Sequence, residues 1–155
     1  MQALLTLAGK GGFAGVRNVL TQRSARTAKA EVTVKMDLGG LADGEEAGLA
    51  HFSRDNCRLA VAQTGGLRKV VRIDQGNETA GPAVTTLGIW LRSTWGEEGM
   101  ARFSYSLDGL AFTEIGSSCR LSWGSYRGDR IGLYTWNSTM EQGYVDFSDF
   151  RYRIE

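Results

Sequence analysis

Short runs in which apolar and polar residues alternate, separated by turn signals, recur along the chain and constrain its fold more than any other feature. The clearest run is Ala30–Asp37, where every second residue is apolar. Because successive residues of a strand face opposite sides of a sheet, this run predicts a strand with one buried face. Turn signals such as Asp43-Gly44 and Gly65-Gly66 follow at intervals of about ten residues. This spacing predicts an all-β fold, a two-sheet antiparallel β-sandwich.

The same patterns give the expected elements one by one. We expect strands at residues 4–7, 19–23, 30–37, 47–52, 59–63, 69–73, 87–95, 101–106, 112–115, 120–123 and 144–154, and one more from Ile131 within the stretch Tyr126–Asn137. Residues 74–84 are expected to form a surface loop, and Asp108-Gly109 a type I′ hairpin turn. No segment combines helical periodicity with caps. The expected core residues are Val32, Val34, Leu59, Val61, Ile89, Leu91, Phe103, Ile131, Leu133, Val145 and Phe147, together with Phe112 and Phe150.

Length and charge set outer limits on the class of protein. The chain has 155 residues with 42% hydrophobic content, which fits a single domain, residues 1–155, with a proper core. A net charge of +1 gives no strong attraction to nucleic acid or to an acidic membrane. No apolar run reaches the roughly 18 residues that a membrane-spanning helix needs. The apolar start of the chain has no basic region before it, so it does not resemble a signal peptide.

Cysteine and histidine are scarce. Cys57 and Cys119 are the only cysteines. A domain of this size does not depend on a disulfide, so we favour two free thiols over one bridge. His51 is the only histidine, which argues against a zinc site and against a Ser-His-Asp triad.

Aromatic and polar side chains suggest a sugar-binding face. A flat aromatic ring can stack on a pyranose, and side chains with fixed donors can bind its hydroxyls. The stacking candidates are Trp90, Trp95, Trp123, Tyr126, Tyr134 and Trp136. The candidates for the hydroxyls are His51, Arg92, Arg127 and Asn137. The alternative for each aromatic residue is burial in the sandwich, and a lone histidine is more often structural than functional.

The alternation of side chains along a strand, here called strand parity, separates some of these alternatives. Ile131 and Leu133 share one side of their strand, which places Tyr134 and Trp136 on the other. The same argument sets Trp90 and Arg92 opposite an aliphatic core face on the strand at 87–95. Trp95 and Tyr126 are expected in turns at the rim of the face that carries Trp136.

Five segments, taken in order, carry a family resemblance. They are Ala47–Phe52, Leu91–Gly96, Phe103–Gly109, Trp123–Gly132 and Gly143–Phe147. In their order and spacing they resemble the C-terminal β-sandwich module of glycoside hydrolase family 43 enzymes, the β-xylosidases and α-L-arabinofuranosidases. The resemblance implies a concanavalin A-like jelly roll. In the parent enzymes this module follows a five-bladed propeller that holds the catalytic carboxylates, and no segment of this sequence matches that propeller.

One loop departs from the family pattern. In the xylosidases a loop of this module inserts a Phe into the neighbouring active site. The matching loop here, Leu41–Glu46, contains no Phe. This difference favours a free-standing module over one that completes an active site. Such modules are also classed as xylan-binding carbohydrate modules.

We therefore expect a non-catalytic carbohydrate-binding module that recognises xylan-type polysaccharide or xylo-oligosaccharides through an aromatic concave face. Its expected partners are plant cell-wall polysaccharide (xylan or arabinoxylan) and a family 43 catalytic domain, and its location is extracellular if it binds polysaccharide. One alternative is an accessory domain that only docks on the catalytic domain. Another is a small glycoside hydrolase acting on xylo- or arabino-oligosaccharides, but no motif assigns the two carboxylates that hydrolysis needs.

A calcium ion is the one cofactor that the resemblance suggests, because jelly-roll sugar modules often hold one. Asp146, with main-chain oxygens near the first strand, is the candidate ligand. An exposed carboxylate without a metal is the favoured alternative at this position.

Overall fold

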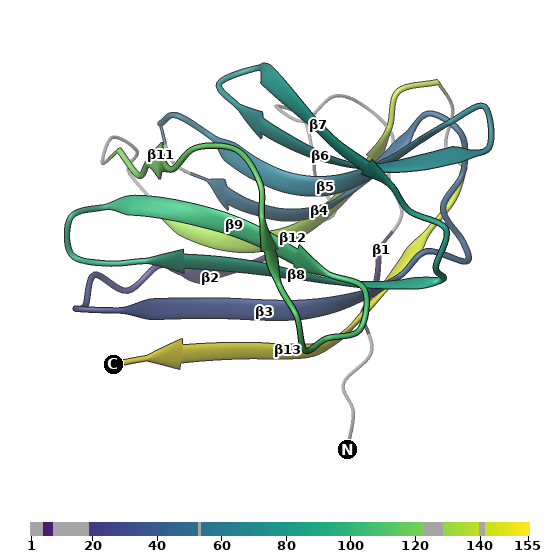
Figure 1. Ribbon diagram of the computed structural model, residues 1–155. Coiled ribbons are helices and arrows are strands. Elements are labelled where there is room, and N and C mark those ends of the chain that lie inside the picture. The colour runs from purple at the N-terminus through teal and green to yellow at the C-terminus, as the bar shows by residue number, and fades with distance from the viewer. Residues whose placement is uncertain (1–4, 8–18, 53, 123–128, 140–141) are drawn as a thin grey trace.

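Two antiparallel sheets form the structure, and they pack face to face (Figure 1). The computed structural model describes residues 5–7, 19–52, 54–122, 129–139 and 142–155. Its strands are β1 (Leu5–Leu7), β2 (Val19–Arg23), β3 (Ala30–Asp37), β4 (Glu45–Phe52), β5 (Cys57–Thr64), β6 (Leu67–Asp74), β7 (Asn77–Ala83), β8 (Gly88–Trp95), β9 (Met100–Ser106), β10 (Thr113–Glu114), β11 (Cys119–Arg120), β12 (Arg130–Asn137) and β13 (Val145–Ile154). The described part of the chain contains no helix, and so none that is long and apolar enough to cross a membrane. The expected all-β sandwich is confirmed.

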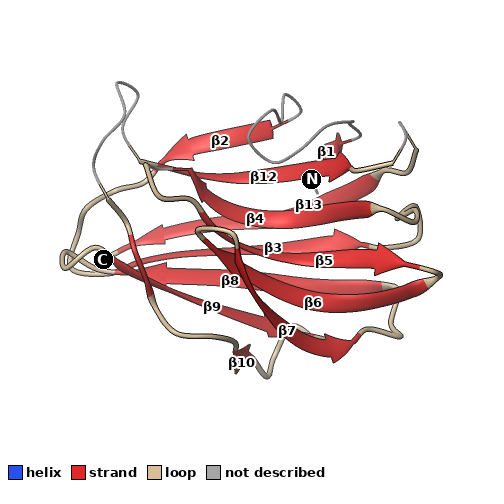
Figure 2. Cartoon of the chain, turned by 90° about the horizontal axis from the view of Figure 1, so that it is seen from above, coloured by secondary structure: helices blue, strands red, loops and turns tan. Residues whose placement is uncertain are grey.

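The strand order shows that the sheets are built from distant parts of the chain. The seven-stranded sheet runs β1-β13-β3-β8-β9-β10, with β11 also on β9, and the six-stranded sheet runs β2-β12-β4-β5-β6-β7. The last two long strands insert between early ones, β13 between β1 and β3, and β12 between β2 and β4 (Figure 2). This jelly-roll connectivity places β12 and β4 side by side, which decides what surrounds Trp136.

The core lies between the inner faces of the two sheets. All eleven aliphatic and aromatic residues expected there between Val32 and Phe147 are at most 2% exposed. Two further expectations are wrong, because Phe150 is 40% exposed and Phe112 lies on the outer face of the seven-stranded sheet under the Arg92 guanidinium. Both residues follow a break in strand regularity, so the alternation that places the other core residues does not extend to them.

Residues 74–84 are a strand and turn, not the expected surface loop. Asp74 and Asn77 pair across Gln75 and Gly76, whose φ angles are 50° and 82°, as a two-residue type I′ turn requires. β7 is the edge of the six-stranded sheet, and its side chains are mostly exposed. Main-chain hydrogen bonds hold it, so its sequence lacks the apolar alternation that marks the other strands.

The Asp108-Gly109 turn also differs from expectation. Of these two residues only Gly109 has a positive φ, of 78°. β9 ends at Ser106 and β10 begins at Thr113, so a longer loop joins them. Asp108 caps this loop, because its Oδ1 accepts hydrogen bonds from the main-chain nitrogens of Leu110 and Ala111 at 2.8 and 2.9 Å.

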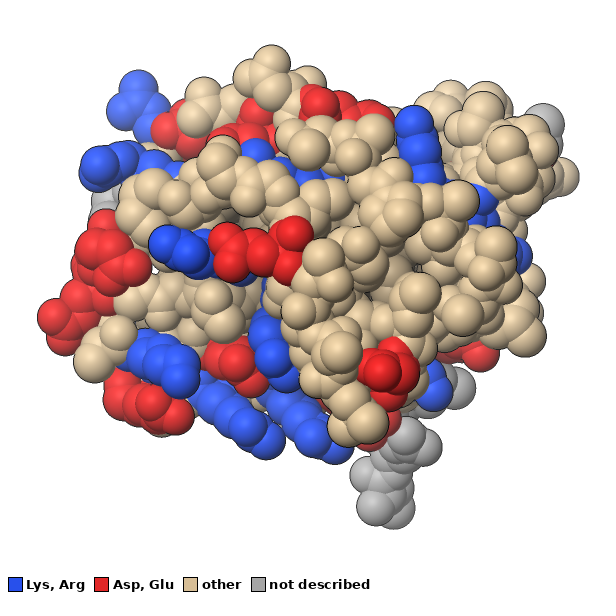
Figure 3. Space-filling view, in the orientation of Figure 1, with Lys and Arg blue, Asp and Glu red and all other residues tan. Residues whose placement is uncertain are grey.

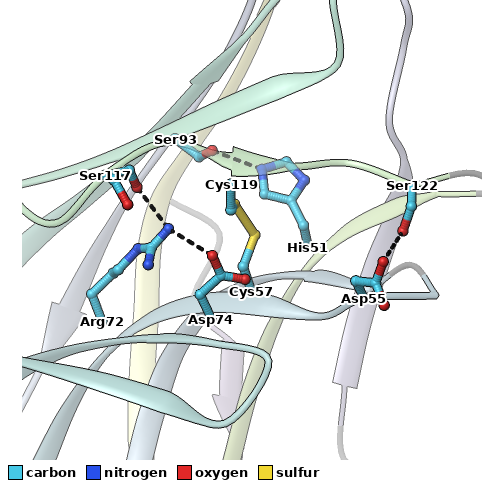
Figure 4. Close-up of a disulfide and its surroundings, with 9 residues drawn as sticks. All are labelled: His51, Asp55, Cys57, Arg72, Asp74, Ser93, Ser117, Cys119 and Ser122. Carbon is cyan, nitrogen blue, oxygen red and sulfur yellow. Dashed lines mark hydrogen bonds and ion pairs between the residues drawn. A yellow bond between two sulfur atoms is a disulfide. The ribbon is translucent and has the colours of Figure 1, made fainter.

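Cys57 and Cys119 form a disulfide, which corrects the expectation of free thiols. The bond joins β5 of the six-stranded sheet to β11 of the seven-stranded sheet, with a Cα–Cα distance of 6.7 Å (Figure 4). The cysteines are 62 residues apart, and only the stacking of the sheets brings them together. Nearby, Arg72 donates to the Ser117 carbonyl at 2.6 Å, and Ser122 donates to Asp55 at 2.8 Å. The segment that carries Cys119 is therefore fastened to the six-stranded sheet at three places.

Removing this disulfide should weaken the fold without changing it. A cross-link that closes a 62-residue loop restricts the unfolded chain, and such bonds typically contribute about 2–4 kcal/mol. We expect the Cys57→Ala/Cys119→Ala variant to lose that much free energy of unfolding in urea titrations. Reductant should destabilise the wild-type chain similarly and leave the double variant unchanged. Overlapping unfolding curves for oxidised and fully reduced wild-type chain would contradict this role.

Candidate functional site

The candidate sugar-binding residues do not converge on one surface. The inner faces of the sheets hold His51, Trp95 and Asn137. The outer face of the six-stranded sheet holds Tyr134 and Trp136, and the outer face of the seven-stranded sheet holds Trp90 and Arg92. Trp123, Tyr126 and Arg127 lie outside the described residues. No single site can therefore use all the residues that the sequence suggested.

His51 and Trp95 belong to the core. His51 is fully buried, with its Nε2 2.7 Å from the Ser93 Oγ (Figure 4), and its ring meets the edge of Trp95 at 5.0 Å and 86°. The Trp95 indole donates to the Ala25 carbonyl at 2.8 Å and is 4% exposed. Neither side chain reaches the surface, which corrects the expectation that they contact a sugar. They instead join β4 of one sheet to β8 of the other.

Burial sets the charge of His51. Loss of solvation lowers the pKa of its imidazole from the ordinary 6.5 to about 3. Its Nδ1 has no hydrogen-bond partner among the described residues. The ring is therefore neutral at pH 7, and protonating it inside the core would cost free energy.

Asn137 holds two loops in place. Its Nδ2 donates to the carbonyl oxygens of Asp43 and Gln142 at 3.2 and 3.1 Å, and its Oδ1 accepts from the Thr139 main-chain nitrogen at 2.9 Å. The side chain is fully buried. These bonds correct its expected contact with sugar hydroxyls and give it a structural role at the end of β12.

Strand parity on β12 is as expected. Ile131 and Leu133 are in the core between the sheets, and Tyr134 and Trp136 pack in a second cluster on the opposite face. Tyr134 is nonetheless 0% exposed. Its hydroxyl donates to Glu46 Oε1 at 2.5 Å, and burial together with the Glu46 carboxylate raises the tyrosine pKa well above its ordinary value. Tyr134 therefore forms the floor of this face and offers no open ring for stacking, which corrects its expected direct contact with a sugar.

Glu46 and Arg58 complete this floor, and the sequence analysis did not identify them. Arg58 Nε donates to the same Glu46 oxygen at 2.6 Å, and both side chains are 13% exposed. Gly48, Ala50 and Ala60 surround the pair with small residues on the same face. The alternation of residues along β4 and β5 could have indicated that Glu46 and Arg58 face outward. That they contact each other and Tyr134 follows only from the pairing of β4 with both β5 and β12.

Trp136 is the partly exposed aromatic residue beside this ion pair. It lies opposite Glu46 in the β12–β4 register. Its indole Nε1 is buried and has no hydrogen-bond partner among the described residues, and the same is true of the Arg130 Nε on the same strand. This face therefore combines an aromatic ring, a fixed ion pair and donors whose acceptors the described chain does not supply.

Trp90 and Arg92 project from β8 on the other outer face. The Arg92 guanidinium lies 3.5 Å above the centre of the Phe112 ring, and its Nε is 3.7 Å from Glu31. Lys35 Nζ is 4.8 Å from the centre of the Trp90 ring. This surface is separated from Trp136 by the whole thickness of the sandwich, so it is a second surface with chemistry of its own.

Asp146 is the candidate metal ligand. Asp146 lies on β13 opposite Asp37 of β3 and Thr6 of β1. No group of three or more His, Cys, Asp or Glu in the described ranges could hold a metal ion. Calcium also accepts main-chain oxygens as ligands, so a site at Asp146 built mainly from main-chain oxygens stays a prediction. We therefore derive no chemistry from a metal here.

The buried His51 should make stability depend on pH. The native pKa of His51, about 3, is below the ordinary 6.5. Between these two pH values the unfolded chain therefore binds one more proton than the folded chain. As the pH is lowered through this range, the free energy of unfolding decreases by up to about 1.4 kcal/mol per pH unit. Burial raises the pKa of Glu45, which has the opposite effect just above 4.5. Subtracting the free energy of unfolding of a His51→Gln variant from that of the wild type, at each pH, leaves the contribution of the histidine. Urea titrations from pH 4 to 7 should show the wild-type advantage over this variant growing with pH, and parallel profiles would contradict the assignment.

A family model and a curated relative both connect the chain to β-xylosidases. Residues 5–153 match the family described as the β-xylosidase C-terminal concanavalin A-like domain. A β-xylosidase of Formosa agariphila is 27% identical over 142 residues, 90% of this chain and 24% of that protein. This chain therefore spans about a quarter of that relative's length.

Solved structures show the same fold. A bifunctional GH43-CE protein of Bacteroides eggerthii superimposes with a TM-score of 0.89 at 24% identity, over 98% of this chain and 21% of that one. A GH43 glycoside hydrolase engineered to display endo-xylanase and exo-arabinofuranosidase activity gives a TM-score of 0.86 at 24% identity, over 98% of this chain and 34% of that one. With the family match extending over residues 5–153, the chain belongs to the C-terminal concanavalin A-like domains of the β-xylosidases of glycoside hydrolase family 43.

Proposed function

We propose that this chain is a non-catalytic accessory module of a family 43 enzyme and that it binds xylan-type polysaccharide on the outer face of the six-stranded sheet. The accessory role follows from the family, because the chain matches a C-terminal domain and about a quarter of its relative. The choice of xylan follows from the names of the relatives, a β-xylosidase and an enzyme with endo-xylanase activity.

Trp136 is the observation that supports this face most strongly. A pyranose stacks on an aromatic ring and hydrogen-bonds through its hydroxyls, so it needs an accessible ring with polar groups at its edge. Trp136 is partly exposed, and its indole donor lacks a partner in the described chain. The exposed part of the ring is the surface on which a pyranose would stack.

The neighbouring residues favour binding over hydrolysis. Cleavage of a glycosidic bond needs two carboxylates, one on each side of the bond. On β12, β4 and β5 the outer face carries one carboxylate, Glu46, and Tyr134 and Arg58 both donate to its Oε1. The hydrolase alternative therefore lacks a second carboxylate on the outer face of these three strands, and Glu78 of the edge strand β7 is paired with Lys69 at 3.8 Å.

Replacing Trp136 tests this proposal. Aromatic anchors at binding sites typically contribute about 2 kcal/mol or more, and about 1.4 kcal/mol is a factor of ten in affinity. Trp136→Ala should weaken retention on insoluble xylan at least tenfold in a depletion assay. Tyr144→Ala, which removes a half-exposed aromatic side chain from outside the surfaces around Trp136 and Trp90, is the matched control and should retain wild-type affinity.

Thermal unfolding of both variants separates binding from folding. If Trp136→Ala stays folded and binds xylan as the wild type does, the proposed face is wrong. If neither the wild-type chain nor any variant is retained on xylan, the alternative of a module that only docks on its catalytic domain is favoured.

A further inference from the structure

A groove of about 330 Å³ crosses the outer face of the seven-stranded sheet. Its floor includes Thr33 and Arg92, one wall is formed by Trp90 with Gly109, and the other by Arg151 and Arg153. The volume is within the range of about 300–1,000 Å³ typical of small-ligand sites. In Figure 3, Lys and Arg are interleaved with Asp and Glu along the lower part of the molecule, where β3 and β13 run in the same view (Figure 1). The groove thus lies on a charged surface, in contrast to the aromatic cluster around Trp136.

A β-bulge in β13 creates the arginine wall. Ser148 pairs with Lys35, and Arg151 pairs with Thr33, so one extra residue is inserted between these two pairs. Asp149 within the bulge has a φ of 51°, a conformation that non-glycine residues rarely adopt. Before the bulge Val145 and Phe147 face the core, and after it Tyr152 takes the inward position. Without the extra residue, Arg151 and Arg153 would point into the core, because a shift by one residue reverses the faces of a strand.

The groove lining carries three carboxylates, Glu31, Asp108 and Asp149, and three guanidinium groups, and its exposed charges include two arginines. Glu31 is paired with Arg92, and Asp108 accepts hydrogen bonds from the main chain of its own loop, which lower the pKa of its carboxyl. Arg151 and Arg153 are exposed and form no ion pair within the described residues. Two guanidinium groups, two residues apart on one strand face, therefore lack an ion-pair partner in the part of the chain that the structure describes.

The loop between β9 and β10 shapes the opposite wall. Gly109 lies so close to Trp90 that a Cβ there would be 2.9 Å from the indole ring. Phe112 of the same loop supports the Arg92 guanidinium from below at 3.5 Å. The loop and its Asp108 cap thus hold an aromatic wall and a cation in place, so the groove exists before a ligand arrives.

We propose that this groove binds a saccharide that carries a carboxylate, a uronic acid residue, with Arg151 and Arg153 on the carboxylate and Trp90 against the sugar ring. The planar guanidinium group matches the two oxygens of a carboxylate. That the ligand is a saccharide rests on the proposed function, and that it is acidic rests on the groove alone. The site is separate from Trp136, so one surface would bind the neutral main chain of the polysaccharide and the other would bind an acidic substituent independently.

Calorimetric titration of the full 155-residue chain tests this site. The probes are methyl β-D-glucuronoside and its neutral counterpart, methyl β-D-glucoside. We expect the acidic glycoside to bind at least tenfold more tightly, and the difference to shrink in high salt because the attraction is electrostatic. The Arg151→Gln/Arg153→Gln variant should lose this preference. The Arg102→Gln/Arg120→Gln variant, which removes two exposed arginines from β9 and β11 of the same sheet, is the charge-matched control and should keep it.

The outcomes separate this proposal from the proposed function. Trp136→Ala should leave the preference for the acidic glycoside intact, whatever its effect on xylan retention. Equal affinity for the two glycosides in the wild-type chain would overturn the proposal. So would a double arginine variant that stays folded in a thermal scan and keeps the preference, because the carboxylate would then bind elsewhere.

Discussion

The apolar layer between the two sheets is the constraint on which the rest of the structure depends. Each strand buries every second side chain in this layer, so its register decides which residues reach the outer faces. Ile131 and Leu133 in the core place Trp136 outside, and Ile89 and Leu91 do the same for Trp90 and Arg92. A polar contact within the layer, from His51 of β4 to Ser93 of β8, and the Cys57–Cys119 bond then fix how the sheets are stacked. Both outer surfaces follow from this arrangement.

The alternation along single strands could be predicted from the sequence, and most of the fold followed from it. The run at Ala30–Asp37 has the bounds found in β3, and the inward and outward residues of β12 are as expected. Trp95 has the same parity as Ile89 and Leu91, so the pattern did indicate burial. The Gly96 that follows suggested a turn position instead, although β8 continues to Trp95 before the chain turns.

What could not be predicted depends on contacts between strands that are far apart in the sequence. The ion pair of Glu46 and Arg58 becomes a floor for Tyr134 only because β12, from near the end of the chain, inserts beside β4. The pairing of Cys57 with Cys119 depends on how one sheet lies over the other. β7 has no apolar alternation because main-chain bonds at a sheet edge are enough to hold it.

The two outer faces differ in chemistry, and this difference suggests a division of roles within one accessory module. The six-stranded sheet presents small residues, one partly exposed tryptophan and the partly buried ion pair of Glu46 with Arg58. The seven-stranded sheet presents a charged groove whose arginines are directed outward by one inserted residue in β13. A polysaccharide with a neutral backbone and acidic substituents offers a partner for each face.

The proposal that the six-stranded sheet binds xylan is tested most directly by the indole resonances of the folded chain. The chain has four tryptophans, so its indole N–H signals can be resolved and assigned by nuclear magnetic resonance with single variants. On titration with xylohexaose, the Trp136 signal should shift with saturation while the buried Trp95 signal stays in place. An unchanged Trp136 signal at xylohexaose concentrations that shift other residues would contradict the account.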